Sequence, residues 1–277
     1  MKFEHTRVYN FEHAFRGMRN PMNSWDKSDS YFGLIDVATD EVDFEIAQEW
    51  NKKDFPEYPE EWSNEAALGE EKWDRWLIEN GILTMDYDKE IAEAAFIGPV
   101  DMDLAQRLIK SGPEHRKFMR QLFVTVDITA PLYWWKEFDT YKVGTVANST
   151  STMHKIASKP ITIDCFEIDD YNPDVLTSSE EIDYLIQFLE GLRLKYLETK
   201  DKRYWKELIR WLPESWLQTR TVTLNYENLL AICSKGQRRH HKLTEWSVSF
   251  IKWARSLPYA QQLIFIDEQT DSEVTSN

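Results

Sequence analysis

The chain has 277 residues, of which 42% are hydrophobic and 14% aromatic, with only nine glycines. This composition predicts a folded, largely helical globule with a substantial core. The formal net charge of −15, from 48 acidic and 33 basic residues, disfavours nonspecific binding to DNA or RNA polymers, because that binding depends on cations that neutralise phosphates. A local basic pocket for a mononucleotide is compatible with this charge.

The cysteines and the hydropathy pattern narrow the class of protein further. Cys165 and Cys233 are the two cysteines, which is too few for a disulfide framework and suits a reducing cytoplasm. No apolar run approaches membrane-spanning length, and the first residues lack the apolar core of a signal peptide. We therefore expect a cytoplasmic protein without a membrane partner.

The first hundred residues predict a strand, a helix and then an acidic region. Residues 1–20 begin with a short strand, followed by a helix that ends at Asn20, before a proline. Residues 21–35 are predicted as loop. The stretch 40–80 is acidic with helical spacing, so residues 21–100 are interpreted as an acidic helical insertion or extension.

The middle of the chain predicts one well-defined strand between two helices. A helix is expected over 101–110, and strict alternation of apolar and polar residues over 122–129 predicts a strand with one buried face. Pro131 closes this strand, and a helix is expected directly after it. A second strand is predicted from three alternating residues, Ile161, Ile163 and Cys165.

The last hundred residues predict mainly helices. Ser178 and Glu181 form a capping-box pattern ahead of a helical apolar stripe. Further helices are expected over 201–210, 221–235 and 242–256, and the polar tail 267–277 is expected to be frayed. The whole chain, 1–277, is interpreted as a single catalytic-type domain. Its predicted fold class is α/β (α+β), helix-rich around a small mixed sheet.

The segment Pro131–Ser151, here called the signature segment, reads P-L-Y-W-W-K-E-F-D-T-Y-K-V-G-T-V-A-N-S-T-S. It resembles the signature of flavin-dependent thymidylate synthases, P-x-F-x-x-R-Q-W-x-R-H-R followed after seven residues by Ser. Thr140, Tyr141 and Lys142 stand where that family has its Arg-His-Arg triplet. Ser151 falls one residue late.

Three other stretches resemble the same family in the same order. Leu212–Leu229, here called the second segment, matches L-P-x-S and N-x-R-S-L at Pro213, Ser215, Asn225 and Leu229. Arg238, His241 and Glu245 follow the order of R-x-x-x-H-A-Q-W-E, with one residue fewer between Arg and His. Residues 111–118 resemble the stretch before the family's strand. The resemblance covers about residues 101–260.

The resemblance implies that the protein methylates dUMP to dTMP with FAD as cofactor and with methylenetetrahydrofolate and NADPH as co-substrates. It also implies a homotetramer that binds a small-molecule nucleotide. Thymidylate synthases of the other kind use a cysteine in a Pro-Cys-His motif. That route is not supported here, because the cysteines lie in D-C-F and I-C-S.

The resemblance assigns residues to three roles. Arg238 is the candidate catalytic residue, since its guanidinium would stabilise negative charge on a uracil carbonyl. The candidate substrate-binding residues are Ser151, Ser149, Thr150 and Arg239. The candidate cofactor-binding residues are Lys142, Tyr141, Asn148, Asn225 and His241. Each has a structural alternative: Arg238 lies in a basic run near a helix end, Asn225 can cap a helix, and a Ser/Thr-rich loop is often only a loop.

No metal site is expected, because His241 and Glu245 lie one helical turn apart without a third ligand cluster.

Several substitutions argue for functional divergence. Thr140 and Tyr141 replace Arg and His, Met153 replaces a nucleotide-binding Arg, and Glu227 replaces the Arg of N-x-R. Lost cations would weaken FAD or dUMP binding, and Arg120, Lys136, Arg220 or Arg239 would have to compensate. Three alternatives stay open: a non-catalytic nucleotide-binding relative without flavin, a related pyrimidine-nucleotide-modifying enzyme, and an unrelated helical interaction protein.

Overall fold

The computed structural model describes residues 1–36, 83–84, 91–141, 143–168, 179–240 and 242–268. The acidic region predicted over 40–80, the capping residue Ser178 and most of the polar tail lie outside these ranges. The chain forms two compact units. Unit 1 comprises Met1–His5 and Val126–Val222, and unit 2 comprises Thr6–Thr125 and Thr223–Asn277.

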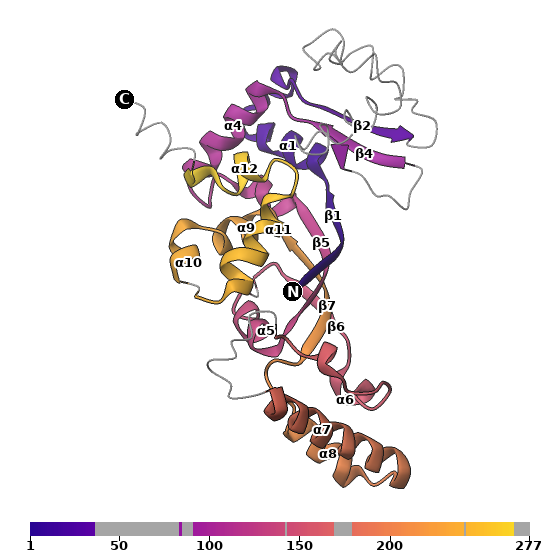
Figure 1. The fold of residues 1–277 in the computed structure, drawn as a ribbon. Helices are drawn as coiled ribbons and strands as arrows, with labels where there is room; N and C mark the ends of the chain where they lie inside the picture. Colours follow the sequence, from indigo (N-terminus) through magenta and orange to yellow (C-terminus); the bar gives the residue numbers. More distant parts are fainter. Residues whose placement is uncertain (37–82, 85–90, 142, 169–178, 241, 269–277) are drawn as a thin grey trace, which may run out of the picture. The chain divides into compact units, whose positions relative to one another are not determined.

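A four-stranded sheet has the strand order β1-β5-β7-β6 (Figure 1). Its strands are β1 (Lys2–Tyr9), β5 (Phe123–Pro131), β7 (Leu217–Asn225) and β6 (Val146–Ser149). Strand β5 confirms the predicted alternation, since Val124, Val126 and Ile128 are fully buried while the residues between them are partly exposed. One face of this strand is therefore apolar and the other polar.

The polar faces of β5 and β7 are joined by side-chain hydrogen bonds. Three pairs are formed: Thr125 with Thr223 at 3.3 Å, Asp127 with Thr221 at 2.5 Å, and Thr129 with Thr219 at 2.7 Å. The two strands are antiparallel, because the numbers rise along β5 as they fall along β7. The helix predicted over 221–235 is therefore wrong in its first five residues. Helix α9 (Tyr226–Ile232) begins only after β7 ends.

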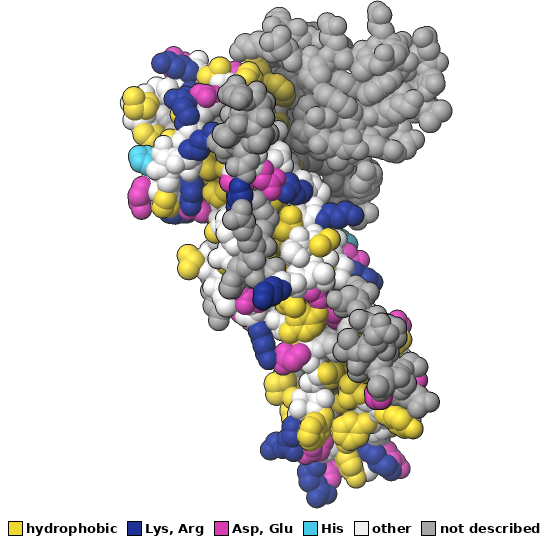
Figure 2. Space-filling view, turned by 60° about the vertical axis from the view of Figure 1, so that its left-hand side comes forward, with side chains coloured by type: hydrophobic (Ala, Val, Ile, Leu, Met, Phe, Trp, Pro, Cys, Tyr) yellow, Lys and Arg dark blue, Asp and Glu magenta, His cyan; other side chains and the backbone are white. Residues whose placement is uncertain are grey.

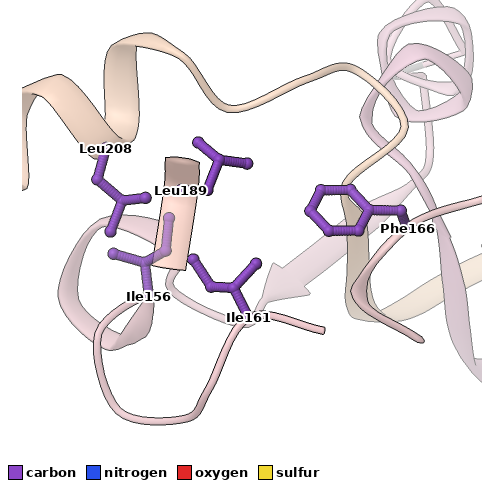
Figure 3. Close-up of a cluster of buried hydrophobic side chains, with 5 residues drawn as sticks. All are labelled: Ile156, Ile161, Phe166, Leu189 and Leu208. Carbon is purple, nitrogen blue, oxygen red and sulfur yellow. The ribbon is translucent and has the colours of Figure 1, made fainter. Parts of the chain in front are cut away.

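Unit 1 contains α5 (Leu132–Phe138), α6 (Thr152–Lys155), η5 (Ile163–Cys165), α7 (Ser179–Thr199) and α8 (Lys202–Arg210). The helices predicted after the first strand and over 201–210 are confirmed as α5 and α8. An apolar cluster lies beside α7 and α8 and consists of Ile156, Ile161, Phe166, Leu189 and Leu208 (Figure 3).

The strand predicted at Ile161, Ile163 and Cys165 is wrong. The backbone N–H of Ile161 donates to the Glu190 carboxylate at 2.8 Å, and that of Cys165 donates to the Thr162 carbonyl at 3.0 Å. The segment is therefore a 3₁₀ turn. It buries Ile161 in the cluster and leaves Ile163 38% exposed. The three apolar residues therefore do not share one buried face, as they would in a strand.

Unit 2 begins with α1 (Phe11–Arg19), which confirms the predicted first helix, followed by η1 (Asn20–Met22) and η2 (Trp25–Lys27). Strands β2 (Tyr31–Asp36), β4 (Ile91–Phe96) and β3 (Leu83–Thr84) form a three-stranded antiparallel sheet in that order. The loop predicted over 21–35 is therefore wrong from Tyr31 onward, because its strand partner lies some 60 residues later in the chain.

The remaining elements of unit 2 are helical and include a helix that confirms the one predicted over 101–110. They are α4 (Pro99–Lys110), η4 (Lys117–Gln121), α9, α10 (Lys235–His240), the π-helical η6 (Glu245–Phe250), α11 (Ile251–Arg255) and α12 (Ala260–Leu263). The segment predicted over 242–256 is thus helical, with a π-helical start. The helix-rich α+β fold built on small sheets is confirmed.

Two polar contacts attach distant parts of unit 2 to each other. Buried Arg19 donates from Nε to Asp101 at 2.5 Å, while Ser28 and Ser30 donate to the other Asp101 oxygen. The Tyr259 hydroxyl donates to the Ala95 carbonyl. Burial of charge is tolerated when it is paired in this way. Within the described ranges, no helix is long and apolar enough to cross a membrane.

Candidate functional site

The signature segment and the second segment are joined by backbone hydrogen bonds in unit 1. The N–H of Leu132 donates to the Trp216 carbonyl at 3.1 Å, and that of Tyr133 donates to the Glu214 carbonyl at 3.2 Å. The Lys136 ammonium donates to the Glu214 carboxylate at 2.6 Å. The first turn of α5 is therefore fixed to the residues that precede β7, although the two segments are about 80 positions apart.

Arg220 lies at the centre of the contact between these segments. Its Nη1 donates to the Asp139 carboxylate at 3.0 Å, and its guanidinium stacks over the Trp135 ring at 4.2 Å from the centroid. The Trp135 indole in turn donates to the Gln218 carbonyl at 2.9 Å. An arginine that is both paired and stacked on an aromatic ring has little rotational freedom. Arg220 is therefore a fixed cation within this unit.

Gln218 connects Arg220 to the Ser/Thr stretch of the signature segment. Its side-chain oxygen accepts from Arg220 Nε at 2.9 Å, and its Nε2 donates to the Thr150 carbonyl at 3.1 Å and to the Thr152 hydroxyl at 3.2 Å. The N–H of Thr150 also donates to the Thr219 carbonyl at 2.9 Å. The stretch is thus held against β7 by both backbone and side-chain bonds.

This stretch holds three candidate substrate contacts and one candidate cofactor contact, Asn148, and all four face solvent at least in part. Asn148, Ser149 and Thr150 are exposed, and Ser151 is partly exposed. The Ser151 oxygen accepts from the His154 N–H at 3.1 Å and caps the short helix α6. A serine hydroxyl also carries one donor hydrogen, which the cap does not use. Ser151 can therefore cap α6 and still donate to an anion.

Asn225 lies at the end of β7 and starts α9 in unit 2. Its side-chain oxygen accepts from the Asn228 N–H at 3.0 Å, while the Asn228 side-chain oxygen accepts from the Asn225 N–H at 3.1 Å. This capping box is the structural alternative foreseen for Asn225. Asn225 is buried, and among the described residues its amide nitrogen donates to none.

Glu227 forms ion pairs with two arginines in unit 2. It stands where the family that this chain resembles has an arginine. Its carboxylate accepts from Arg120 Nε at 2.8 Å and from Arg116 Nε at 3.3 Å. The hydrogen bond from Arg120 to Glu227 raises the pKa of the Arg120 guanidinium. Arg120 is therefore committed to an ion pair, as Lys136 is to Glu214.

The remaining predicted residues are placed as follows. Tyr141 follows α5 and is partly buried, and its carbonyl accepts from the Thr145 hydroxyl at 2.9 Å. Arg238 and Arg239 lie in α10. Lys142 and His241 lie outside the described residues. Within the ranges that the structure describes, no three His, Cys, Asp or Glu side chains are grouped as metal ligands.

Sequence reasoning did not single out Trp135, Asp139 or Gln218, and it weighed Arg220 only as a substitute cation. Each of these residues owes its place to a partner 66 to 83 positions away. The available signal was that Trp135 lies in the helix of the signature segment and Asp139 directly follows that helix, while Gln218 and Arg220 are two positions apart on a strand. That signal becomes usable only once residues 217–225 are recognised as strand.

No protein-family model matches this sequence, and no curated protein matches it by sequence. Among solved structures, thymidylate synthase X (ThyX) from Helicobacter pylori with FAD and dUMP is 13% identical, with a TM-score of 0.54, and covers 96% of this chain and 98% of its own. A second complex of that enzyme with FAD and dUMP is 17% identical, with a TM-score of 0.45, over 61% of this chain and 84% of its own.

The UMP/dUMP methylase PolB from Streptomyces cacaoi, bound with 5-Br dUMP, is 13% identical, with a TM-score of 0.44, over 61% of this chain and 82% of its own. At these identities the first match shows that this chain shares the ThyX-like fold. Fold alone does not establish activity.

Proposed function

We propose that this protein binds dUMP and FAD and methylates the uracil ring, with methylenetetrahydrofolate as the one-carbon donor and NADPH as the reductant. The observation that most supports this proposal is the attachment of the signature segment to the second segment through Gln218. Each of these two segments resembles the same family on its own, and in the structure they share one group of hydrogen bonds. The shared fold is consistent with this function, and we further propose the homotetrameric assembly implied by the resemblance.

The substrate phosphate is assigned to Ser149, Thr150 and Ser151. Ser149 and Thr150 are exposed, and the partly exposed Ser151 hydroxyl keeps a hydrogen to donate. Arg220 would contribute positive charge from β7, partly balanced by Asp139. Charge-assisted hydrogen bonds of this kind each contribute about 1.5–3 kcal/mol. Dianionic phosphate would therefore bind more tightly than an uncharged nucleoside.

Two of the residues assigned to flavin, Asn148 and Asn225, carry side-chain amides that can donate to carbonyl oxygens. The Asn225 amide nitrogen donates to no described residue, and the Asn148 amide is exposed. Flavin, when bound, would supply the hydride that the methylation consumes. Arg238 is assigned to the uracil carbonyl, where a permanent cation stabilises the charge that develops as C5 becomes nucleophilic.

A non-catalytic nucleotide-binding protein is the second candidate function. It is favoured by Glu227, whose carboxylate occupies Arg116 and Arg120, and by the loss of two cations at Thr140 and Tyr141. Such a protein would bind dUMP and form no methylated product. Product analysis therefore separates the two candidates.

The proposed function is tested with the full chain and Arg238→Ala. Deoxyuridylate methylation would be followed by product mass with FAD, methylenetetrahydrofolate and NADPH, and folding by circular dichroism. Arg203→Ala is the matched control, because Arg203 is 91% exposed on α8 and, among the described residues, forms its ion pair with nearby Asp201. We expect Arg238→Ala to lose turnover while folding is retained and the control is unchanged. A parent chain that binds dUMP without product would establish the second candidate.

A further inference from the structure

Helix α7 carries an apolar face that nothing in the described structure covers. Tyr184 is 68% exposed, Phe188 48% and Leu185 37%, although Leu189 in the same helix is fully buried. Hydrophobic side chains gather over the part of the molecule formed by α7 and α8 (Figure 2). Neighbouring exposed aromatic and aliphatic side chains are typical of a surface that binds another protein.

The exposed residues belong to one continuous stripe along α7. At 3.6 residues per turn, its members lie within about 60° of the line through Phe188. They repeat with spacings of three and four, as in a helix–helix seam: Glu181, Tyr184, Leu185, Phe188, Gly191, Leu192 and Lys195. The buried residue Leu189 lies on the side of α7 that packs against α8. Leu192 is partly buried and packs against the same cluster as Leu189, so it lies at the edge of the stripe, whereas the other members are exposed.

Gly191 gives a separate indication that another backbone approaches this face. A Cβ atom built on Gly191 meets no atom within 4 Å, so the fold of this chain does not require glycine there. Glycine inside a helix costs about 1 kcal/mol relative to alanine. A glycine at the middle of an exposed stripe does allow a second helix to come close.

The stripe is complementary to itself when turned end to end. A two-fold axis at Phe188 places Leu185 opposite Gly191 and Tyr184 opposite Leu192, so each large side chain faces a smaller or aliphatic one. The same axis places acidic Glu181 opposite basic Lys195, twice. A parallel arrangement would instead set like charges side by side. Self-complementarity of this type is what an isologous interface requires.

We propose that the α7 stripe binds the same stripe of a second copy of this chain, antiparallel and two-fold symmetric about Phe188. The Lys195 ammonium donates to Glu198 at 3.0 Å, and both side chains are exposed. Exposed pairs of this kind are weak, so Lys195 can exchange Glu198 for Glu181 of the partner subunit. The interface goes beyond the homotetramer that the resemblance implies, because it names the residues of one contact between subunits and uses none of the nucleotide-site residues.

The geometry is tested by disulfide formation in the full chain carrying Cys165→Ser. Because position 188 lies on the axis, Phe188→Cys brings two thiols together when the two stripes pair at this residue, and the charge exchange described next separates the antiparallel from the parallel arrangement. Leu194→Cys is the matched control, since Leu194 is 52% exposed on the same helix but about 120° from the line through Phe188. We expect covalent dimer to form at least about tenfold faster through position 188. Equal rates, or no dimer, would overturn the proposal.

The charge pairing is tested by sedimentation equilibrium. Glu181→Lys or Lys195→Glu alone should weaken self-association by about threefold or more, and the double exchange should restore it. Asp183→Lys is the control, because Asp183 is exposed in the same turn but outside the stripe. A double variant that associates no better than either single variant would contradict the pairing.

A monomeric protein whose Phe188→Cys thiol is shielded would also contradict the proposal, because another segment of the chain would then cover the stripe. A protein that binds no flavin but still forms this dimer would contradict the proposed function and leave the interface proposal intact.

Discussion

Arg220 donates from Nε to the side-chain oxygen of Gln218 at 2.9 Å, and this contact fixes which way the Gln218 amide points. A guanidinium can only donate, so the amide oxygen faces Arg220 and the amide nitrogen faces Thr150 and Thr152. One side chain thereby orders a cation on one side and a hydroxyl-rich stretch on the other. Gln218 is a positioning residue in this account, and it needs no contact with a ligand.

Gln218→Ala should loosen the stretch Thr150–Thr152. Three hydrogen bonds are lost, each contributing about 0.5–1.5 kcal/mol, so we expect a loss of about 1.5–4.5 kcal/mol in the free energy of unfolding. The dUMP dissociation constant, measured calorimetrically, should rise several-fold. Gln187→Ala, at an exposed position of α7, should change neither quantity. Unchanged dUMP affinity in a destabilised Gln218→Ala protein would show that the stretch does not bind the nucleotide.

Arg220→Lys should keep the charge and lose the planar contacts. Lysine cannot bond Gln218 and Asp139 as one rigid fork, and it stacks less well on Trp135. We expect weaker binding of dUMP and of inorganic phosphate by about tenfold, with a smaller effect on uncharged deoxyuridine. Arg210→Lys on α8 is the control, because Arg210 is half-exposed and pairs only with Glu207. Equal losses for dUMP and deoxyuridine would argue against a phosphate role.

Glu227→Arg should destabilise unit 2, although it restores the residue that the resembling family carries. It would bring a third cation beside Arg116 and Arg120 and remove the carboxylate that pairs them. Lost charge-assisted hydrogen bonds predict about 2–3 kcal/mol less stability in urea denaturation. Adding Arg120→Glu should recover part of this loss, whereas additive effects would show that the two residues do not interact.

Burial of Tyr259 predicts a loss of stability at alkaline pH. Desolvation raises the pKa of its hydroxyl to about 12 from an ordinary value of 10.0. The folded protein binds the hydroxyl proton more tightly than the unfolded chain does. The resulting stabilisation is complete below pH 10 and is lost as pH rises from 10 to 12. The two-unit shift corresponds to about 3 kcal/mol.

Tyr259→Phe is the matching variant for this pH dependence. It should flatten the stability profile between pH 10 and 12 when unfolding is followed by denaturant titration. It should also cost some stability at neutral pH, because the hydroxyl donates to Ala95 and accepts from Ile97. Tyr226 is buried and shifted in the same direction, so a residual slope is expected. A variant profile as steep as that of the parent would exclude Tyr259 as the titrating group.

The strand β5 could be predicted because its pattern is local. Val124, Val126 and Ile128 alternate with polar residues over one face, and Pro131 marks the end. Strand β7 was not predicted, because its apolar residues Val222 and Leu224 run directly into the helical spacing of α9. What makes it a strand is pairing with β5, about 95 positions earlier, and no local pattern contains that information.

The candidate site was predicted only in part for the same reason. The stretch Asn148–Ser151 was identified from its resemblance to a family motif, and the structure places it along β7. Gln218 holds that stretch by a hydrogen bond to Thr150, and Arg220 in turn bonds Gln218. These residues meet only because β7 lies beside the stretch in the folded chain. Asn225 was foreseen either as a ligand or as a helix cap. The structure shows the cap, which leaves the ligand role of its amide nitrogen as a prediction.

A flavin titration of the full chain tests the central claim most directly. Absorbance and fluorescence of FAD would be followed with increasing protein, in the absence and presence of dUMP. The account predicts stoichiometric FAD binding that dUMP strengthens, because the proposed reaction transfers a hydride from the flavin while the uracil ring is bound. No FAD binding at high micromolar protein, with or without dUMP, would contradict it and leave a flavin-free protein that shares only the fold.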